Sequence, residues 1–279
     1  MSKSREKLLI LSIVALVIAA MLFIAYSLFN RLRSSNRAPV IYCESDTIYV
    51  SVDATDEDLL VGVTALDEED GDLTSSVVVG NISSFSGKGK CEITYAVFDS
   101  GNKVATAKRQ LYYTDYHPPR FVLKDDFVFY AGESANLLKN VSAFDCIDGE
   151  ISNRISMAWI ENDDDSKIAE FQVINSRGDI SMLTAQVTTV ERSSQNAPSI
   201  ALSDYLVYLE AGAMLDPLDY VKSITVSKKI YTPNEYGRDT LSYDLGDFNS
   251  AVPGLYRIGI FCDSGEAVGM AELLVMIEG

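Results

Sequence analysis

The stretch that decides the fold is residues 63–74, VTALDEEDGDLT, which recurs without a gap 78 residues later as residues 141–152, VSAFDCIDGEIS. Each copy joins an alternating apolar segment to an acidic turn around a glycine, Gly71 in the first copy and Gly149 in the second. Self-similarity at a fixed period is the signature of tandem modules. The sequence therefore predicts an array of repeated domains.

Two further landmarks indicate three copies. A turn at residues 99–102 (DSGN) reappears at 175–178 (NSRG) and at 263–266 (DSGE). Each copy follows a proline-containing junction, at Pro39, at Pro118 and at Pro198, and prolines favour extended linkers. In the third copy residues 222–229, KSITVSKK, replace the acidic turn, so this copy is divergent. We predict three modules with the bounds 38–116, 117–196 and 197–279.

The segments before these turns alternate with a period of two. Cys91, Ile93, Tyr95 and Val97 are separated by single residues, as in a strand with one buried face. After Arg37 no stretch shows a sustained helical period with start and stop signals. Short strands with frequent turn signals favour an antiparallel β-sandwich of roughly seven strands for each module.

The order of these features resembles a known family. A proline, a strand, V-x-A-x-D-x-x-D-G-D-[LIV]-[TS], a strand with alternating apolar residues, D-x-G-N and a last strand is similar to the bacterial Ig-like domain of Gram-positive surface proteins and some pesticidal crystal proteins. The resemblance covers residues 38–116 and 117–196 and is weaker in 197–279. It implies an all-β fold of tandem Ig-like antiparallel sandwiches with an extracellular structural or adhesive role, and it implies no chemistry.

Residues 8–29 form an uncharged run, LLILSIVALVIAAMLFIAYSLF. As a helix it would extend about 33 Å, enough to cross a hydrocarbon core of roughly 30 Å. The alternative is a cleaved signal peptide, since Ala25 and Ser27 are small residues spaced like a cleavage site. A run of this length favours a retained transmembrane helix between a cytoplasmic lead (1–7) and a juxtamembrane linker (30–37).

Basic residues flank the run on both sides, so the positive-inside count does not orient it. The short lead and the family resemblance favour a cytoplasmic N-terminus and extracellular modules. Six of the 23 basic residues and one of the 40 acidic residues precede Ala38, which leaves the modules with 17 basic and 39 acidic residues. Such an acidic surface argues against nucleic acid as a partner, because nucleic acid requires basic patches.

The carboxylates of the first acidic turn are candidate calcium ligands, because calcium takes several oxygen ligands from one loop. The spacing differs from an EF-hand loop, which places glycine sixth and glutamate twelfth. The alternative is a structural turn in which glycines supply a positive φ and aspartates bond local N–H groups. The candidate calcium ligands are Asp67, Glu69, Asp70 and Asp72, and the structural turn glycines are Gly71, Gly149 and Gly101.

The four cysteines are scattered and form no CxxC pair. Cys43 and Cys91 fall in the first module and are candidates for a disulfide in an oxidising compartment, with two buried thiols as the alternative. A second acidic run at residues 161–165, ENDDD, is expected to be a solvated loop.

The chain has one histidine, His117, and it lies in a proline junction rather than beside a nucleophile. We therefore expect no enzyme. The sequence favours a membrane-anchored extracytoplasmic surface protein that acts as a spacer, an adhesin or a protein-binding module. Its partners would be the membrane, through residues 8–29, and an extracellular protein or a cell-wall glycan. The alternative is a bitopic scaffold subunit of a cell-envelope complex for division or export.

Overall fold

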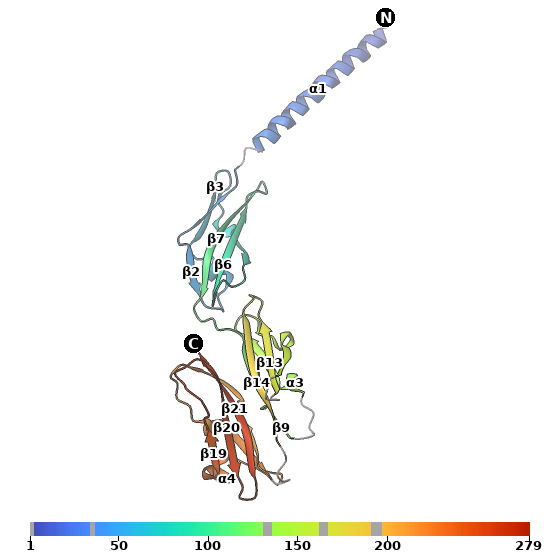
Figure 1. Ribbon diagram of the computed structural model, residues 1–279. Helices are drawn as coiled ribbons and strands as arrows, with labels where there is room; N and C mark the ends of the chain where they lie inside the picture. The colour runs from blue at the N-terminus through green and yellow to red at the C-terminus, as the bar shows by residue number, and fades with distance from the viewer. Residues whose placement is uncertain (1–2, 34–36, 131–135, 162–166, 191–196) are drawn as a thin grey trace. The chain divides into compact units, whose positions relative to one another are not determined.

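The computed structural model describes residues 3–33, 37–130, 136–161, 167–190 and 197–279 (Figure 1). The chain divides into two compact units, Met1–Asp115 and Tyr116–Gly279. The first unit holds an N-terminal helix and one β-sandwich, and the second unit holds two further β-sandwiches. We call these sandwiches modules 1, 2 and 3 in chain order.

Helix α1 (Lys3–Arg33) contains the apolar run, and its segment Leu9–Phe29 has a mean hydropathy of 2.9. None of this segment is buried against the rest of the chain. The helix is long and apolar enough to cross a membrane, a property that membrane anchors share with secretory signal sequences. It continues to Arg33, so the first residues of the expected linker 30–37 are helical.

Module 1 consists of two sheets. The first has the order β1-β3-β4 and the second has the order β2-β7-β6-β5. Its strands are β1 (Val40–Cys43), β2 (Thr47–Val50), β3 (Val63–Asp67), β4 (Gly71–Asp72), β5 (Val78–Ile82), β6 (Lys90–Phe98) and β7 (Val104–Tyr113). Two short helical turns, α2 (Asp56–Leu59) and η1 (Thr74–Ser76), connect them.

Module 2 has the sheet orders β11-β10-β8 and β12-β13-β14-β9. Its strands are β8 (Arg120–Leu123), β9 (Val128–Tyr130), β10 (Val141–Asp145), β11 (Gly149–Glu150), β12 (Ser156–Glu161), β13 (Lys167–Ile174) and β14 (Ile180–Val190). Its helical turns are α3 (Leu137–Asn140) and η2 (Ser152–Arg154).

Module 3 has the sheet orders β15-β17-β18 and β16-β21-β20-β19. Its strands are β15 (Ser199–Leu202), β16 (Leu206–Glu210), β17 (Val221–Val226), β18 (Lys229–Tyr231), β19 (Leu241–Asp244), β20 (Gly254–Asp263) and β21 (Val268–Glu278). Its helical turns are η3 (Pro217–Tyr220), α4 (Pro233–Tyr236) and η4 (Arg238–Thr240).

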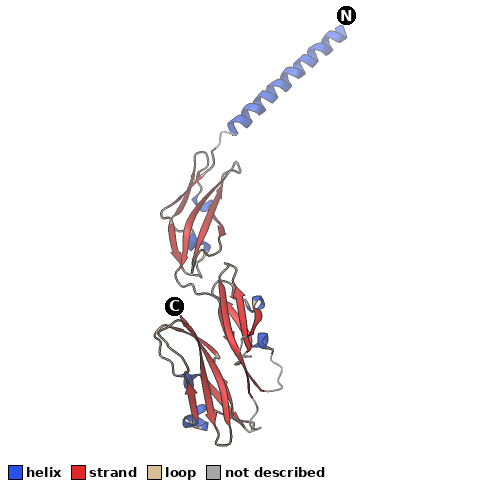
Figure 2. Cartoon of the chain, viewed as in Figure 1, coloured by secondary structure: helices blue, strands red, loops and turns tan. Residues whose placement is uncertain are grey.

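The three modules share one topology among their described strands, with two sheets of the same strand order in each. Figure 2 shows the strands of the modules in red and their short helical turns in blue. The predicted all-β fold of sandwiches behind an apolar helix is therefore confirmed, including the divergent third copy. In that copy a tight hairpin turn replaces the acidic loop, with Ser227 and Lys228 at φ of 48° and 68° between β17 and β18. Positive φ at two consecutive residues is the geometry of a two-residue hairpin turn.

The sandwiches are antiparallel, as expected, except at one pair of strands in each module. The second strand of each module pairs in parallel with the last strand, as β2 does with β7, β9 with β14, and β16 with β21. Only three or four residues separate the first strand of a module from the second. The chain therefore passes from one sheet to the other within a short segment between its first two strands. The second strand then runs in the same direction as the last strand, so this pair is parallel.

The core of module 1 confirms the period-two pattern. Cys91, Ile93, Tyr95 and Val97 on β6 are all buried. On the neighbouring strand β7 the inward positions include Leu111, which is also buried, and Arg109, which is only 5% exposed. A buried arginine in an apolar layer is the exception that leads to the candidate site.

Candidate functional site

The acidic turn of module 1 is held by hydrogen bonds to its own backbone. Asp67 Oδ1 accepts from the N–H groups of Glu69 and Asp70 at 2.9 and 2.8 Å. Asp72 Oδ1 accepts from Thr74 N at 2.9 Å, and its hydrogen bonds to the Thr74 side chain and backbone lower the pKa of this carboxyl. Two of the four candidate calcium ligands therefore cap the turn that contains them.

A third candidate ligand reaches across the sandwich to the turn between β6 and β7. The Asp70 carboxylate accepts from Ser100 N at 2.6 Å and from Ser100 Oγ at 2.9 Å. Module 2 repeats this contact, since Asp148 accepts from Ser176 N at 2.7 Å and from Ser176 Oγ at 2.6 Å. The motif that identifies the repeat thus joins two loops by hydrogen bonds. The fourth candidate ligand, Glu69, is exposed on the surface.

Among the described residues no group of three or more His, Cys, Asp or Glu side chains is arranged to hold a metal ion. Calcium binding by Asp67, Glu69, Asp70 and Asp72 therefore stays a prediction that the structure does not test. The second acidic run falls mostly at residues 162–166, which lie outside the described residues.

The turn glycines differ in their roles. Gly71 and Gly149 have φ of 78° and 70°, the left-handed conformation expected of them. In the turn between β6 and β7, Asn102 takes the positive φ of 62° instead of Gly101. Asparagine tolerates this conformation because its short side chain bonds locally.

Cys43 and Cys91 lie on different sheets of module 1, on β1 and β6. Cys91 belongs to the core, and Cys43 packs against the same core. The two residues form no disulfide in this structure. Burial raises the pKa of the Cys43 thiol, against the opposing effect of Arg109, so this thiol is not activated as a nucleophile. The disulfide stays a prediction.

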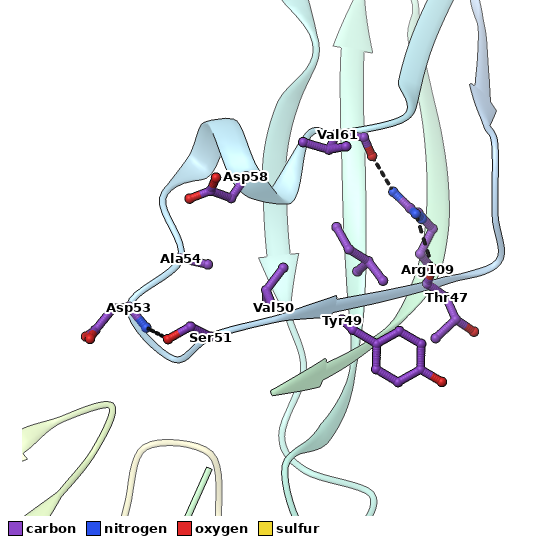
Figure 3. Close-up of a pocket in the computed structure, with 10 residues that line it drawn as sticks. Thr47, Tyr49, Val50, Ser51, Asp53, Ala54, Asp58, Val61 and Arg109 are labelled. Carbon is purple, nitrogen blue, oxygen red and sulfur yellow. Dashed lines mark hydrogen bonds between the residues drawn. The ribbon is translucent and has the colours of Figure 1, made fainter. Parts of the chain in front are cut away.

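A pocket of about 630 Å³ lies beside β2 in module 1 (Figure 3). Strand β2 is the edge of its sheet, and residues 51–61, which include α2, form the opposite wall. The pocket is lined by the apolar and aromatic residues Ile48, Tyr49, Val50, Ala54 and Val61 and by the polar residues Thr47, Ser51, Asp53, Asp58 and Arg109. This volume is within the range of small-ligand sites.

Arg109 is the buried charge of this pocket. Its Nη1 donates to Val61 O at 2.8 Å and its Nη2 donates to Thr47 O at 3.3 Å (Figure 3). Its Nε is buried and has no hydrogen-bond partner among the described residues. The hydroxyl of Tyr95 donates to Leu59 O at 2.8 Å. Burial raises the pKa of Tyr95, and the nearby Arg109 opposes this rise. The acceptors that bond this cation are therefore neutral carbonyl groups.

Sequence reasoning missed Arg109, although a signal was present. Arg109 has the same parity on β7 as Ala105, Ala107 and Leu111, so period-two alternation places it on the core face. On the other wall, Asp58 completes a capping box with Thr55 at the start of α2, and these hydrogen bonds lower the pKa of Asp58. The backbone N–H of Asp53 donates to Ser51 Oγ at 3.2 Å.

In the second unit, modules 2 and 3 share one continuous hydrophobic core cluster. Arg120 of module 2 makes a bidentate ion pair with Glu278 of module 3. Its Nη2 donates to Oε2 at 2.6 Å and its Nε donates to Oε1 at 3.2 Å. Tyr208 accepts from Phe121 N at 2.8 Å, and burial raises the pKa of Tyr208 to about 12. These contacts fix the two sandwiches to each other.

A second polar contact between modules 2 and 3 involves charged groups with little exposure. Glu272 is 3% exposed and pairs with Arg257, which also donates to Gln186 of module 2. Asp126 Oδ2 accepts from Glu272 N at 3.1 Å. Burial raises the pKa of Asp126 to about 6, with a further contribution from neighbouring carboxylates.

The expected role of His117 as a junction residue agrees with its surroundings. Its Nδ1 lies 2.9 Å from Pro118 O, a carbonyl that only accepts, so this nitrogen is the donor. The adjacent Tyr116 is buried at the edge of module 2 and donates to Asp179 at 2.6 Å. Burial and the hydrogen bond to Asp179 raise the pKa of Tyr116.

No protein-family model matches the sequence, and no curated protein matches it. Among solved structures, the chain is similar to a part of Clostridium perfringens ZmpB that contains CBM51-2, in complex with GlcNAc, and INT domains. The identity is 15%, the TM-score is 0.23, and the match covers 54% of this chain and 41% of that chain.

Two other similar structures are the extracellular cadherin domains 1–5 of protocadherin gamma B2 and the lipoprotein BT2262 from Bacteroides thetaiotaomicron. The first has 10% identity and a TM-score of 0.19, with 88% of this chain and 61% of that chain covered. The second has 12% identity and a TM-score of 0.19, with 85% and 98% covered. The chain spans less than two thirds of the ZmpB and protocadherin chains, and at these scores the likeness carries no functional argument.

Proposed function

We propose that this chain is a membrane-anchored extracytoplasmic surface protein that binds a partner through its β-sandwiches. The observation that carries the proposal is one exposed apolar helix, Leu9–Phe29, followed by three sandwiches of the same topology. The residue pattern of modules 1 and 2 supports membership of the Ig-like domains of Gram-positive surface proteins. In this role the helix fixes one end of the chain, and the sandwiches present loops and edge strands for recognition.

The charge of the modules supports an extracytoplasmic binding role. The chain has a net charge of −17, and its acidic residues concentrate after Ala38. Such a surface keeps the modules soluble and repels anionic lipid and nucleic acid. The partner we propose is therefore an extracellular protein or a cell-wall glycan. We also propose that the chain acts by binding and not by catalysis, with His117 bonded within its proline junction.

The test is protease shaving of intact cells that express the chain with one tag at each terminus. We expect the C-terminal tag to be lost and the N-terminal tag to stay protected. A C-terminal tag that is cleaved only after lysis would overturn the proposed topology. Release of the modules into the medium without the N-terminal tag would identify the helix as a cleaved signal instead of an anchor.

A matched pair of variants tests whether residues 8–29 are the anchor. Leu16→Arg together with Ala20→Arg places two charges in the middle of the helix, at a cost of about 2.5–3.5 kcal/mol each. We expect this variant to leave the membrane fraction. The control Leu16→Ile keeps the hydropathy and should remain membrane-bound. Membrane retention of the double arginine variant would show that another part of the chain holds it there.

The alternative function, a bitopic scaffold of a division or export complex, predicts a different result. Purification from membranes in mild detergent would then recover a stable partner at a fixed stoichiometry. A free-standing surface protein would be recovered without one.

A further inference from the structure

Arg109 occupies a position at which the other two modules are apolar. The N–H groups of Gln110, Thr188 and Leu274 make the same hydrogen bond, each to the residue that precedes the second strand of its module. These three residues are therefore equivalent, and so are the residues before them, Arg109, Val187 and Leu273. Leu273 is fully buried and Val187 packs against the core. The sandwich topology thus requires only an apolar side chain here.

The arginine in module 1 carries a charge that the fold leaves unpaired. Its guanidinium bonds two carbonyl oxygens, its Nε is unpartnered, and it forms no ion pair within the described part of the chain. A buried charge without a counterion costs several kcal/mol. Arginine is also the side chain best suited to bind a carboxylate with two parallel hydrogen bonds. A carboxylate ligand would supply the missing counterion.

The opposite wall of the pocket carries charges of the other sign. Asp53 and Asp58 lie on that wall (Figure 3). These carboxylates and the net charge of −17 repel a ligand that is only anionic. They attract an ammonium group, however. A ligand that carries a carboxylate and an ammonium group therefore suits both Arg109 and the wall with the two aspartates.

We propose that module 1 binds a free amino acid or short peptide in its zwitterionic form. The carboxylate of the ligand bonds Arg109, its ammonium group faces Asp53 and Asp58, and its apolar part contacts Ile48 and Val61. This inference rests on the proposed binding role but not on the membrane topology. A negative titration would overturn the ligand and leave the result of protease shaving unaffected.

The test is isothermal titration calorimetry on the full chain in detergent with trialanine, which carries one carboxylate and one ammonium group. Trialanine amide lacks the carboxylate and N-acetyl-trialanine lacks the ammonium group. We expect each blocked peptide to bind about ten- to hundredfold more weakly, because each loses a charged hydrogen bond. Free alanine is the fourth probe, and its affinity relative to trialanine identifies whether the ligand is the amino acid or the peptide.

Arg109→Leu installs the residue that module 3 has at this position. We expect it to fold with an unchanged or higher melting temperature and to lose trialanine affinity by about ten- to hundredfold. Lys108→Ala is the control, because it removes the same charge from an exposed side chain of the neighbouring position. It should keep the affinity within about twofold.

Three outcomes would overturn the proposal. One is the absence of binding by both trialanine and alanine at millimolar concentration. Another is equal affinity for trialanine and its two blocked forms. The last is a lower melting temperature of Arg109→Leu with unchanged affinity, which would show that Arg109 serves the fold alone.

Discussion

The carboxylate of Asp70 accepts hydrogen bonds from both the N–H and the hydroxyl of Ser100, which lies 30 residues further along the chain. Asp148 and Ser176 repeat this contact in module 2. The contact joins the acidic turn after β3 to the turn between β6 and β7. This contact gives a physical reason for the aspartate that precedes the turn glycine in both copies of the repeat.

Asp70→Ala removes both acceptors from Ser100, so we expect it to destabilise module 1 by about 1–3 kcal/mol. Hydrogen exchange of the peptide that contains Ser100 should become faster. The control is Glu69→Ala, which removes an exposed carboxylate of the same turn and should leave the exchange unchanged. Equal exchange rates in the two variants would contradict a stabilising role for the contact between Asp70 and Ser100.

Calcium should have little effect on the melting temperature of the full chain. Asp67, Asp70 and Asp72 already accept hydrogen bonds from backbone N–H groups, and a cation would have to displace some of these donors. We expect the same calorimetric melting curve with calcium and with a chelator. A higher melting temperature in calcium that Asp72→Asn abolishes would instead support the calcium site.

Asp126 should make the second unit less stable as the pH rises from about 4 to about 6. The pKa of Asp126 is about 6 in the folded chain, above its ordinary value of 3.8, so the folded state holds this proton more tightly. This stabilisation is complete below pH 3.8 and is lost as the pH rises through 6. The slope from this group is at most about 1.4 kcal/mol per pH unit.

Asp126→Asn cannot ionise and should lack this part of the slope. Urea unfolding followed by the fluorescence of Trp159, the single tryptophan, reports on the second unit. Glu266→Gln removes the same charge from an exposed residue of the second unit that does not act on Asp126, and it serves as the control. If Asp126→Asn and the parent chain show the same pH dependence, Asp126 does not ionise between the two modules.

Gly269→Ala should destabilise module 3 strongly. A Cβ at Gly269 would lie 2.0 Å from the carbonyl oxygen of Pro198, so the backbone of one strand would have to move. Overpacking of this kind costs about 1–3 kcal/mol or more. Gly87→Ala is the control, because a Cβ there meets open space. A parental melting temperature for Gly269→Ala would show that β15 can shift without cost.

Much of the fold was predictable because its signals are local. The alternation of Cys91, Ile93, Tyr95 and Val97 defines a strand and its buried face without knowledge of the partner strand. The parallel pairing of β2 with β7 was not predictable, because it depends on where the chain crosses between sheets. The joining of modules 2 and 3 through Arg120 and Glu278 has no local signal, since 158 residues separate them.

The sequence by itself determined an apolar run long enough to cross a membrane, a repeated acidic turn and a period-two strand pattern, which together specify an array of β-sandwiches behind an apolar helix. These properties depend on neighbours within a few residues, so they can be read along the chain. Only the tertiary structure decided that Asp70 bonds Ser100 and that Arg109, which has no ion pair among the described residues, is buried in a pocket that Asp53 and Asp58 also line. Such contacts depend on which distant segments meet, and burial changes the energy of a charge only once the surrounding strands have closed over it.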